Sequence, residues 1–183
     1  MPETAPPLDP SGLALAEIAR DVAERRLPPV AAWNPTHCGD SHMRIARDGT
    51  WYHEGAPIRR PAMVRLFATI LRREADGSHV LVTPAEKLDI AVEDAAFVAV
   101  EARSEGDGVA RRIAFRLNTD EWVIAGPDHL LTMRDGIPYL AVRDGLEALV
   151  ARPVFYELAE FAIAEGHDPL GLWSDGSFMA LAG

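Results

Sequence analysis

The chain carries the same combination of a turn signal and a helix-start signal twice. In the first copy Arg47-Asp48-Gly49 precedes Arg59-Arg60-Pro61, and in the second Arg134-Asp135-Gly136 precedes Arg152-Pro153. An Asp-Gly pair between strand-like runs favours a two-residue hairpin turn, because both central positions can adopt positive φ. Proline fits the first turn of a helix, where its missing N–H needs no partner. Each copy is therefore predicted to form a β-hairpin followed by a helix.

The apolar faces of the two predicted helices match in register. When Pro61 is aligned with Pro153, five apolar positions of the first helix fall on apolar positions of the second. The five pairs are Met63 with Phe155, Leu66 with Leu158, Phe67 with Ala159, Ile70 with Ala162, and Leu71 with Ile163. The second copy has five additional residues between its turn and its helix. We infer a duplicated unit, and two related modules that face one another predict a shared groove for a ligand or partner.

The remaining pattern predicts an α+β protein, because helical and strand-like segments are segregated along the chain. Period-two alternation between residues 79 and 126 is typical of antiparallel strands. The expected organisation is a disordered lead and an N-terminal amphipathic helix in residues 1–32, a first α+β module in 33–78, a β-meander in 79–126 and a second α+β module in 127–183.

Local signals set the expected helix boundaries. The N-terminal helix is predicted from about Leu13 to Leu27, where Pro28-Pro29 ends it because proline cannot donate the next backbone hydrogen bond. The helix of the first module is predicted from Pro61 to about Arg73. The helix of the second module is predicted from Pro153 to about Glu165, with Gly166 as a left-handed stop.

Composition excludes several classes of function. The net charge of -10 opposes the phosphate backbone, so nucleic-acid binding is not expected. No apolar run approaches the roughly 20 residues that cross a bilayer, and the first ten residues lack the pattern of a secretory signal. The single cysteine, Cys38, has no partner for an internal disulfide, which fits a reducing compartment. The sequence therefore predicts a cytoplasmic protein without a membrane anchor.

The densest group of potential metal ligands or catalytic side chains is His37, Cys38, Asp40 and His42. Imidazole, thiolate and carboxylate groups bind zinc, and a cysteine beside a histidine can act as a nucleophile. However, the spacing matches no standard zinc motif, and a short loop rarely supplies four converging ligands. We expect a loop in which Asp40 accepts hydrogen bonds from backbone amides and Cys38 is buried as a small apolar residue. The sequence identifies no catalytic set and no cofactor.

Motifs from about Pro29 to the C-terminus carry a family resemblance. They are Trp33-Asn34-Pro35, Cys38-Gly39-Asp40, the run from Met43 to Trp51, Gly55-x-Pro57-Ile58, Val64-Arg65-Leu66-Phe67, Leu81-Val82-Thr83-Pro84-x-Glu86-Lys87, Val92-Glu93-Asp94 and Phe97. These motifs resemble the bacterial family called Domain of Unknown Function 1285. The resemblance implies two repeated α+β modules and a role in signalling or ligand sensing, and it implies no catalytic residues. The family favours an acidic residue where this chain has His42, which argues against a metal site there.

Three hypotheses for function follow. The first is a non-enzymatic module that binds a small ligand or a protein partner, with a role in signalling. Its site is predicted to combine Cys38, Asp40, Arg44, Trp51 and Arg59 near the boundary between modules. The second is a metal-dependent or cysteine-based hydrolase that uses the loop from His37 to His42. The third is a structural interaction protein that forms a homodimer through its N-terminal helix.

Overall fold

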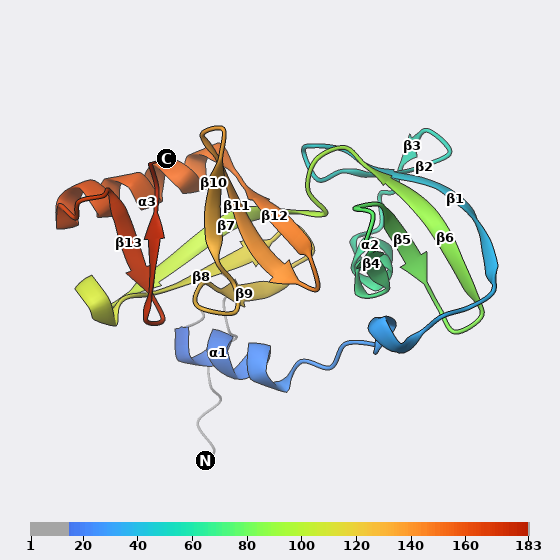
Figure 1. The fold of residues 1–183 in the computed structure, drawn as a ribbon, viewed down its shortest axis with the longest axis horizontal. Helices are drawn as coiled ribbons and strands as arrows, with labels where there is room; N and C mark the ends of the chain where they lie inside the picture. The colour runs from blue at the N-terminus through green and yellow to red at the C-terminus, as the bar shows by residue number, and fades with distance from the viewer. Residues whose placement is uncertain (1–14, 183) are drawn as a thin grey trace, which may run out of the picture.

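The computed structural model describes residues 15–182 and contains two six-stranded β-sheets (Figure 1). The first sheet comprises β1 (His37–Ile45), β2 (Trp51–His53), β3 (Ala56–Pro57), β4 (Leu71–Arg73), β5 (His79–Val82) and β6 (Glu86–Val92). The second comprises β7 (Phe97–Glu105), β8 (Arg112–Leu117), β9 (Trp122–Ile124), β10 (Leu131–Arg134), β11 (Ile137–Arg143) and β12 (Leu146–Val150). The disordered lead and the first helical residues that the sequence predicts lie outside the described residues.

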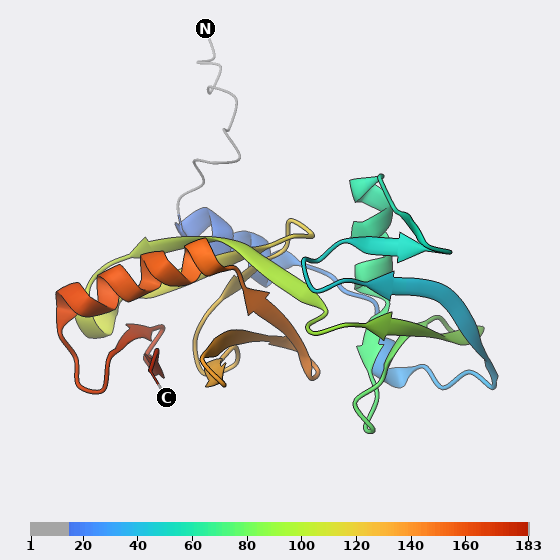
Figure 2. The same cartoon turned by 90° about the horizontal axis from the view of Figure 1, so that it is seen from above.

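Three helices and one hairpin accompany the sheets. They are α1 (Leu15–Glu24), α2 (Pro61–Thr69), α3 (Arg152–Glu165), and the strands β13 (Gly171–Ser174) and β14 (Ser177–Ala180), with the short 3-10 helices η1 (Val30–Ala32) and η2 (Gly108–Ala110). The helix α2 connects β3 to β4, whereas α3 follows β12 and runs alongside β7 (Figure 2). No helix within residues 15–182 is long and apolar enough to cross a membrane.

The two sheets have the same topology. The strand order is β3-β2-β1-β6-β5-β4 in the first and β9-β8-β7-β12-β11-β10 in the second. In both sheets the first and last strands are parallel neighbours at the centre, and an antiparallel three-strand meander lies on each side. The α+β class is therefore confirmed, and the chain contains two similar six-stranded sheets. Buried apolar side chains of both sheets form one contiguous core.

The sequence repeat relates different halves of the two sheets. Its first copy is the meander β1-β2-β3 followed by α2, and its second is the meander β10-β11-β12 followed by α3. The first copy supplies the first three strands of its sheet in chain order, whereas the second copy supplies the last three strands of its sheet. The segment predicted as one meander over 79–126 is divided, because β5 and β6 complete the first sheet and β7 to β9 begin the second.

Three local expectations differ from the structure. The predicted loop at His37 is the start of β1, because its backbone pairs in parallel with β6. The helix α2 ends at Thr69 rather than near Arg73, because residues 71–73 pair with β5. Asp48 and Gly49 belong to a longer loop, in which the Gly49 N–H donates to the Ala46 carbonyl and the Ala46 N–H to the Thr50 carbonyl. The second copy follows the prediction, since Asp135 and Gly136 both have positive φ.

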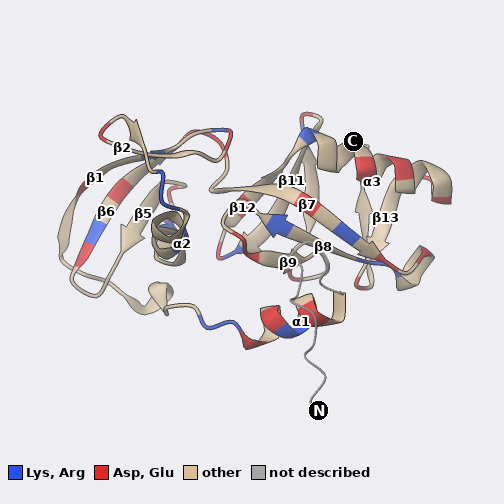
Figure 3. Cartoon of the chain, turned by 180° about the vertical axis from the view of Figure 1, so that it is seen from behind, with Lys and Arg blue, Asp and Glu red and all other residues tan. Residues whose placement is uncertain are grey.

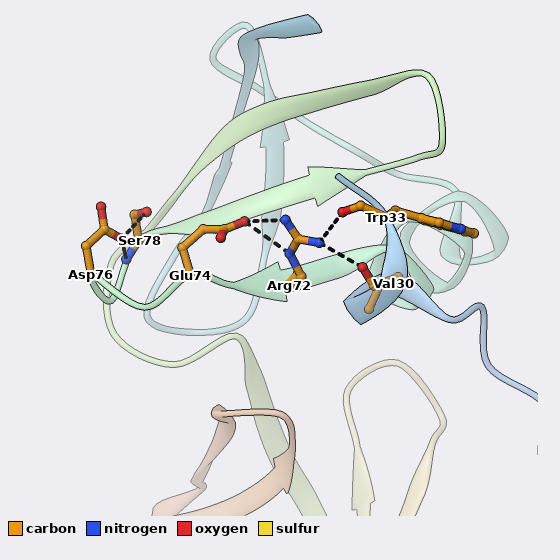
Figure 4. Close-up of polar contacts among 6 residues, drawn as sticks. All are labelled: Val30, Trp33, Arg72, Glu74, Asp76 and Ser78. Carbon is orange, nitrogen blue, oxygen red and sulfur yellow. Dashed lines mark hydrogen bonds and ion pairs between the residues drawn. The ribbon is translucent and has the colours of Figure 1, made fainter. Parts of the chain in front are cut away.

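The N-terminal segment from α1 to η1 packs against both sheets. Leu15 and Ile18 of α1 are buried against Trp122 of the second sheet, and the exposed side of α1 carries both signs of charge (Figure 3). Further along, η1 lies against the first sheet, where the Arg72 guanidinium donates to the carbonyls of Val30 and Trp33 at 2.7 Å each (Figure 4). A dimer that forms through the apolar face of α1 would have to displace it from the second sheet.

Candidate functional site

A cavity of about 330 Å³ lies where the first copy of the repeat meets the second sheet. Its walls come from the loop between β1 and β2, the start of α2, and Asn118 in the turn between β8 and β9. We call it the α2 cavity. The local sequence explains two of its walls, because a strand, a tight loop and a helix that begins at Pro61 follow one another within a short stretch of chain.

Trp51 forms the floor of the α2 cavity. The side chain is 1% exposed and stacks on Phe67, with ring centroids 6.5 Å apart. The indole Nε1 is buried and has no hydrogen-bond acceptor among the described residues. Buried N–H donors are almost always paired in folded proteins, and an unpaired donor costs about 1–3 kcal/mol. A ligand that supplies an acceptor would remove this cost.

The rim of the α2 cavity is positively charged. Arg59 is exposed and makes no hydrogen bond or ion pair with the described residues, while Arg65 pairs with Asp120 at 3.2 Å. The start of α2 has no side-chain cap, so the partial positive charge of the helix N-terminus adds to the charges of Arg59 and Arg65. The one acidic residue in the lining is Asp48, and the Thr50 backbone N–H, which donates to it at 2.9 Å, lowers the pKa of that carboxyl.

Asn118 closes the cavity from the second sheet. Its Nδ2 donates to the Gly49 carbonyl at 3.1 Å, and its Oδ1 accepts from the Val98 N–H at 3.0 Å. A Cβ atom on Gly49 would lie 2.7 Å from the Asn118 Nδ2. This close approach, together with a φ of +90° at Gly49, explains why glycine occupies the position.

The structure brings together two of the five predicted site residues, since Trp51 and Arg59 both line the α2 cavity. Cys38 and Asp40 are exposed on the first half of β1, and neither lines the α2 cavity. Arg44 is on β1 as well, where it pairs with Glu93 instead of lining the cavity.

The residues of the hydrolase hypothesis spread along β1. Cys38 is exposed rather than buried, and the side chains of His37 and His42 are 71% and 66% exposed. Asp40 accepts a hydrogen bond from the His42 backbone N–H at 2.8 Å, as expected for an acidic side chain that satisfies local amides. Within residues 15–182, no group of three or more His, Cys, Asp or Glu side chains is placed to hold a metal ion.

Among the lining residues that sequence reasoning did not place in the site, Arg65 and Asn118 carry polar groups that a ligand could contact. Arg65 follows Arg59 after less than two helical turns, so a helix that begins at Pro61 could have suggested it. Asn118 lies in a turn far along the chain, and no local signal connects it to Gly49.

Comparisons with known proteins identify the family of this chain. Residues 28–95 match the N-terminal domain of a family described as a domain of unknown function (DUF1285), and residues 96–181 match the C-terminal domain of DUF1285. The boundary between the two matches falls between β6 and β7, where the two sheets are joined. The helix α1 precedes both matches. No curated protein matches the chain.

Two crystal structures of family members have similar folds. A DUF1285 family protein from Silicibacter pomeroyi DSS-3 is 43% identical, with a TM-score of 0.78 over 92% of this chain and 94% of that one. A DUF1285 family protein from Shewanella baltica OS155 is 22% identical, with a TM-score of 0.53 over 68% of this chain and 92% of that one. The second similarity concerns the fold alone.

Proposed function

Because the chain belongs to the DUF1285 family, whose description assigns no activity, we propose a function from the geometry of the α2 cavity. The protein is a non-enzymatic binding protein, and its ligand is a small organic anion with a short apolar body. The observation that carries this proposal is the buried indole N–H of Trp51, which has no acceptor within the described chain, beneath a rim where Arg59 has no partner.

The charges and surfaces of the cavity select the ligand class. A carboxylate or a phosphate supplies acceptor oxygens, and charge-assisted hydrogen bonds to arginine are stronger than neutral ones. Ile58, Val64 and Pro61 offer apolar contacts for the remainder of the molecule. A volume of about 330 Å³ suits a metabolite rather than a peptide.

Ligand binding at this place gives the protein a means of sensing. Asn118 belongs to the second sheet and Gly49 to the first, and both line the α2 cavity, so a ligand in this cavity contacts both sheets. A ligand that binds one arrangement of the two sheets more tightly shifts the population toward that arrangement. A protein partner can then read the change, which supports a role in signalling.

Titration of the ¹⁵N-labelled full chain with hexanoate, followed by NMR, tests the proposal. We expect a saturable shift of the Trp51 indole N–H signal, which a Trp51→Phe variant identifies. Arg59→Gln should weaken binding by about fivefold or more, because an exposed arginine contact contributes up to about 1 kcal/mol and a partly desolvated one contributes more.

Arg60→Gln is the matched control, because Arg60 is the neighbouring exposed arginine and does not line the α2 cavity. It should leave affinity unchanged. Hexanol, which has the same chain length without the charge, should bind much more weakly. An indole signal that does not respond to hexanoate or to inorganic phosphate, or equal losses in the two arginine variants, would contradict the assignment.

A further inference from the structure

The second copy of the repeat forms a cavity of its own. This cavity has a volume of about 410 Å³ and lies between the turn from β10 to β11, the end of β12 and the start of α3. We call it the α3 cavity. Aligned positions of the repeat line the two cavities: Gly49 and Gly136, Ile58 and Val150, Arg59 and Ala151, and Val64 and Tyr156. Each copy of the sequence repeat therefore lines a cavity, and the two cavities have different side chains in their walls.

The charge of the α3 cavity is opposite to that of the protein as a whole. The chain has 28 acidic and 18 basic residues, yet the only charged residues that line this cavity are Arg47 and Arg152. Arg152 is exposed and makes no hydrogen bond or ion pair with the described residues. Arg47 comes from the loop between β1 and β2, where its backbone N–H donates to the Glu93 carboxylate at 2.9 Å and its guanidinium pairs with Asp94 at 3.6 Å. Two arginines and no acidic residue thus line this cavity, and Arg152 is the arginine whose charge has no partner among the described residues.

The remaining walls of the α3 cavity are apolar and partly aromatic. Tyr156 is 58% exposed and makes no hydrogen bond or ring contact with the described residues, and Phe155 beside it is half-buried. Pro138 contributes a flat apolar face on the side of the β-hairpin. A planar ring stacks well on such side chains, and it stacks on guanidinium groups as well.

We propose that the α3 cavity is a second binding site, which takes an aromatic anion such as an aryl carboxylate. The arginine pair holds the negative group, and Tyr156 with Phe155 covers the ring. In the first copy Trp51 is a buried floor, whereas the aligned Pro138 leaves the second cavity wider and without an indole donor. The two sites therefore differ in ligand preference.

The test is an NMR titration of the ¹⁵N-labelled full chain with naphthalene-2-carboxylate. We expect saturable shifts of the Gly136, Ala151 and Arg152 amide signals. Arg152→Gln should raise the dissociation constant about tenfold, since it removes one charge-assisted contact. Tyr156→Ala should raise it several-fold and Tyr156→Phe should not, because the ring rather than the hydroxyl covers the ligand.

Two controls separate this site from general affinity for aromatic acids. Arg60→Gln changes the arginine at the aligned position of the first copy, which lines neither cavity, and should leave the dissociation constant unchanged. Naphthalene-2-methanol should bind at least about tenfold more weakly, because it lacks the charge. The proposal is overturned if these amides do not shift, if the alcohol binds as tightly as the acid, or if Arg152→Gln has no effect in a variant whose spectrum remains folded. Failure of the α2 cavity to bind hexanoate would leave this result unaffected.

Discussion

The two glycines of the repeat offer a direct measure of how closely the sheets pack. Gly49 and Gly136 occupy aligned turn positions, and both have positive φ, +90° and +74°. A Cβ on Gly49 would lie 2.7 Å from Asn118 Nδ2 and 3.0 Å from Val98 Cγ2, both in the second sheet. A Cβ on Gly136 would have no neighbour within 4 Å. The two Gly→Ala substitutions therefore share a backbone cost but differ in their steric cost.

The expected losses in the free energy of unfolding follow from this difference. A non-glycine residue at positive φ costs about 1–2 kcal/mol, and the reduced entropy of the unfolded chain offsets about 0.4–1 kcal/mol of that. Gly136→Ala should thus lower the free energy of unfolding by about 1 kcal/mol. Gly49→Ala adds an overpacking cost of about 1–3 kcal/mol, so its loss should be about 3 kcal/mol. The double variant Gly49→Ala/Asn118→Ala should lose less stability than the sum of the two single variants, because the shorter side chain at position 118 removes the nearest steric clash.

Urea denaturation at neutral pH measures these free energies, with tryptophan fluorescence and far-UV circular dichroism followed in parallel. The m-value of each variant should match that of the unmodified chain, so that changes in midpoint report stability. Equal losses for Gly49→Ala and Gly136→Ala would refute the reasoning. That result would mean that the first-copy turn does not press against Asn118 and Val98, and the α2 cavity would lose its wall from the second sheet.

Two further predictions concern the N-terminal helix and pH. Ile18→Ala should weaken the packing of α1 on the second sheet by about 2 kcal/mol, because Ile18 is fully buried. Hydrogen exchange should then accelerate within α1 while β1 to β6 stay protected. Uniform acceleration across the chain would contradict the prediction that α1 detaches independently. Burial, and then the charge of Arg73, lowers the pKa of His79 from its ordinary value of 6.5. The unfolded chain therefore takes up this proton at a higher pH than the folded protein does, so the free energy of unfolding should fall as pH drops below about 6.5. His79→Gln should flatten that dependence in urea titrations.

Local signals were sufficient for the elements that depend on neighbours in sequence. The helix α3 begins at Arg152 and ends at Glu165, and Gly166 follows with a φ of +69°, which is the left-handed stop expected of a glycine there. The second Asp-Gly turn has positive φ at both residues, as predicted. Such features depend on steric limits within a few residues, which the sequence shows directly.

Local signals failed for the segments whose backbone pairs with distant parts of the chain. The first half of β1 contains Gly39 and polar side chains, so nothing in it indicates a strand, yet its backbone pairs with β6. Leu71 fits the apolar face of a helix, but its backbone pairs with Leu81 of β5, so it belongs to the sheet. Strand pairing is made by backbone groups that every residue carries, so the choice of partner is decided by the rest of the fold.

The candidate sites divide in the same way. The sequence by itself determined the starts of α2 and α3 and the second Asp-Gly turn, and it placed Trp51 and Arg59 in one predicted site. Only the tertiary structure decided which residues close each cavity, since Asn118 reaches the first unit from the second sheet and Arg47 reaches the second unit from the first. The reason is physical: a turn is specified by its own residues, whereas a wall shared by two sheets exists only once both have folded and packed into one core.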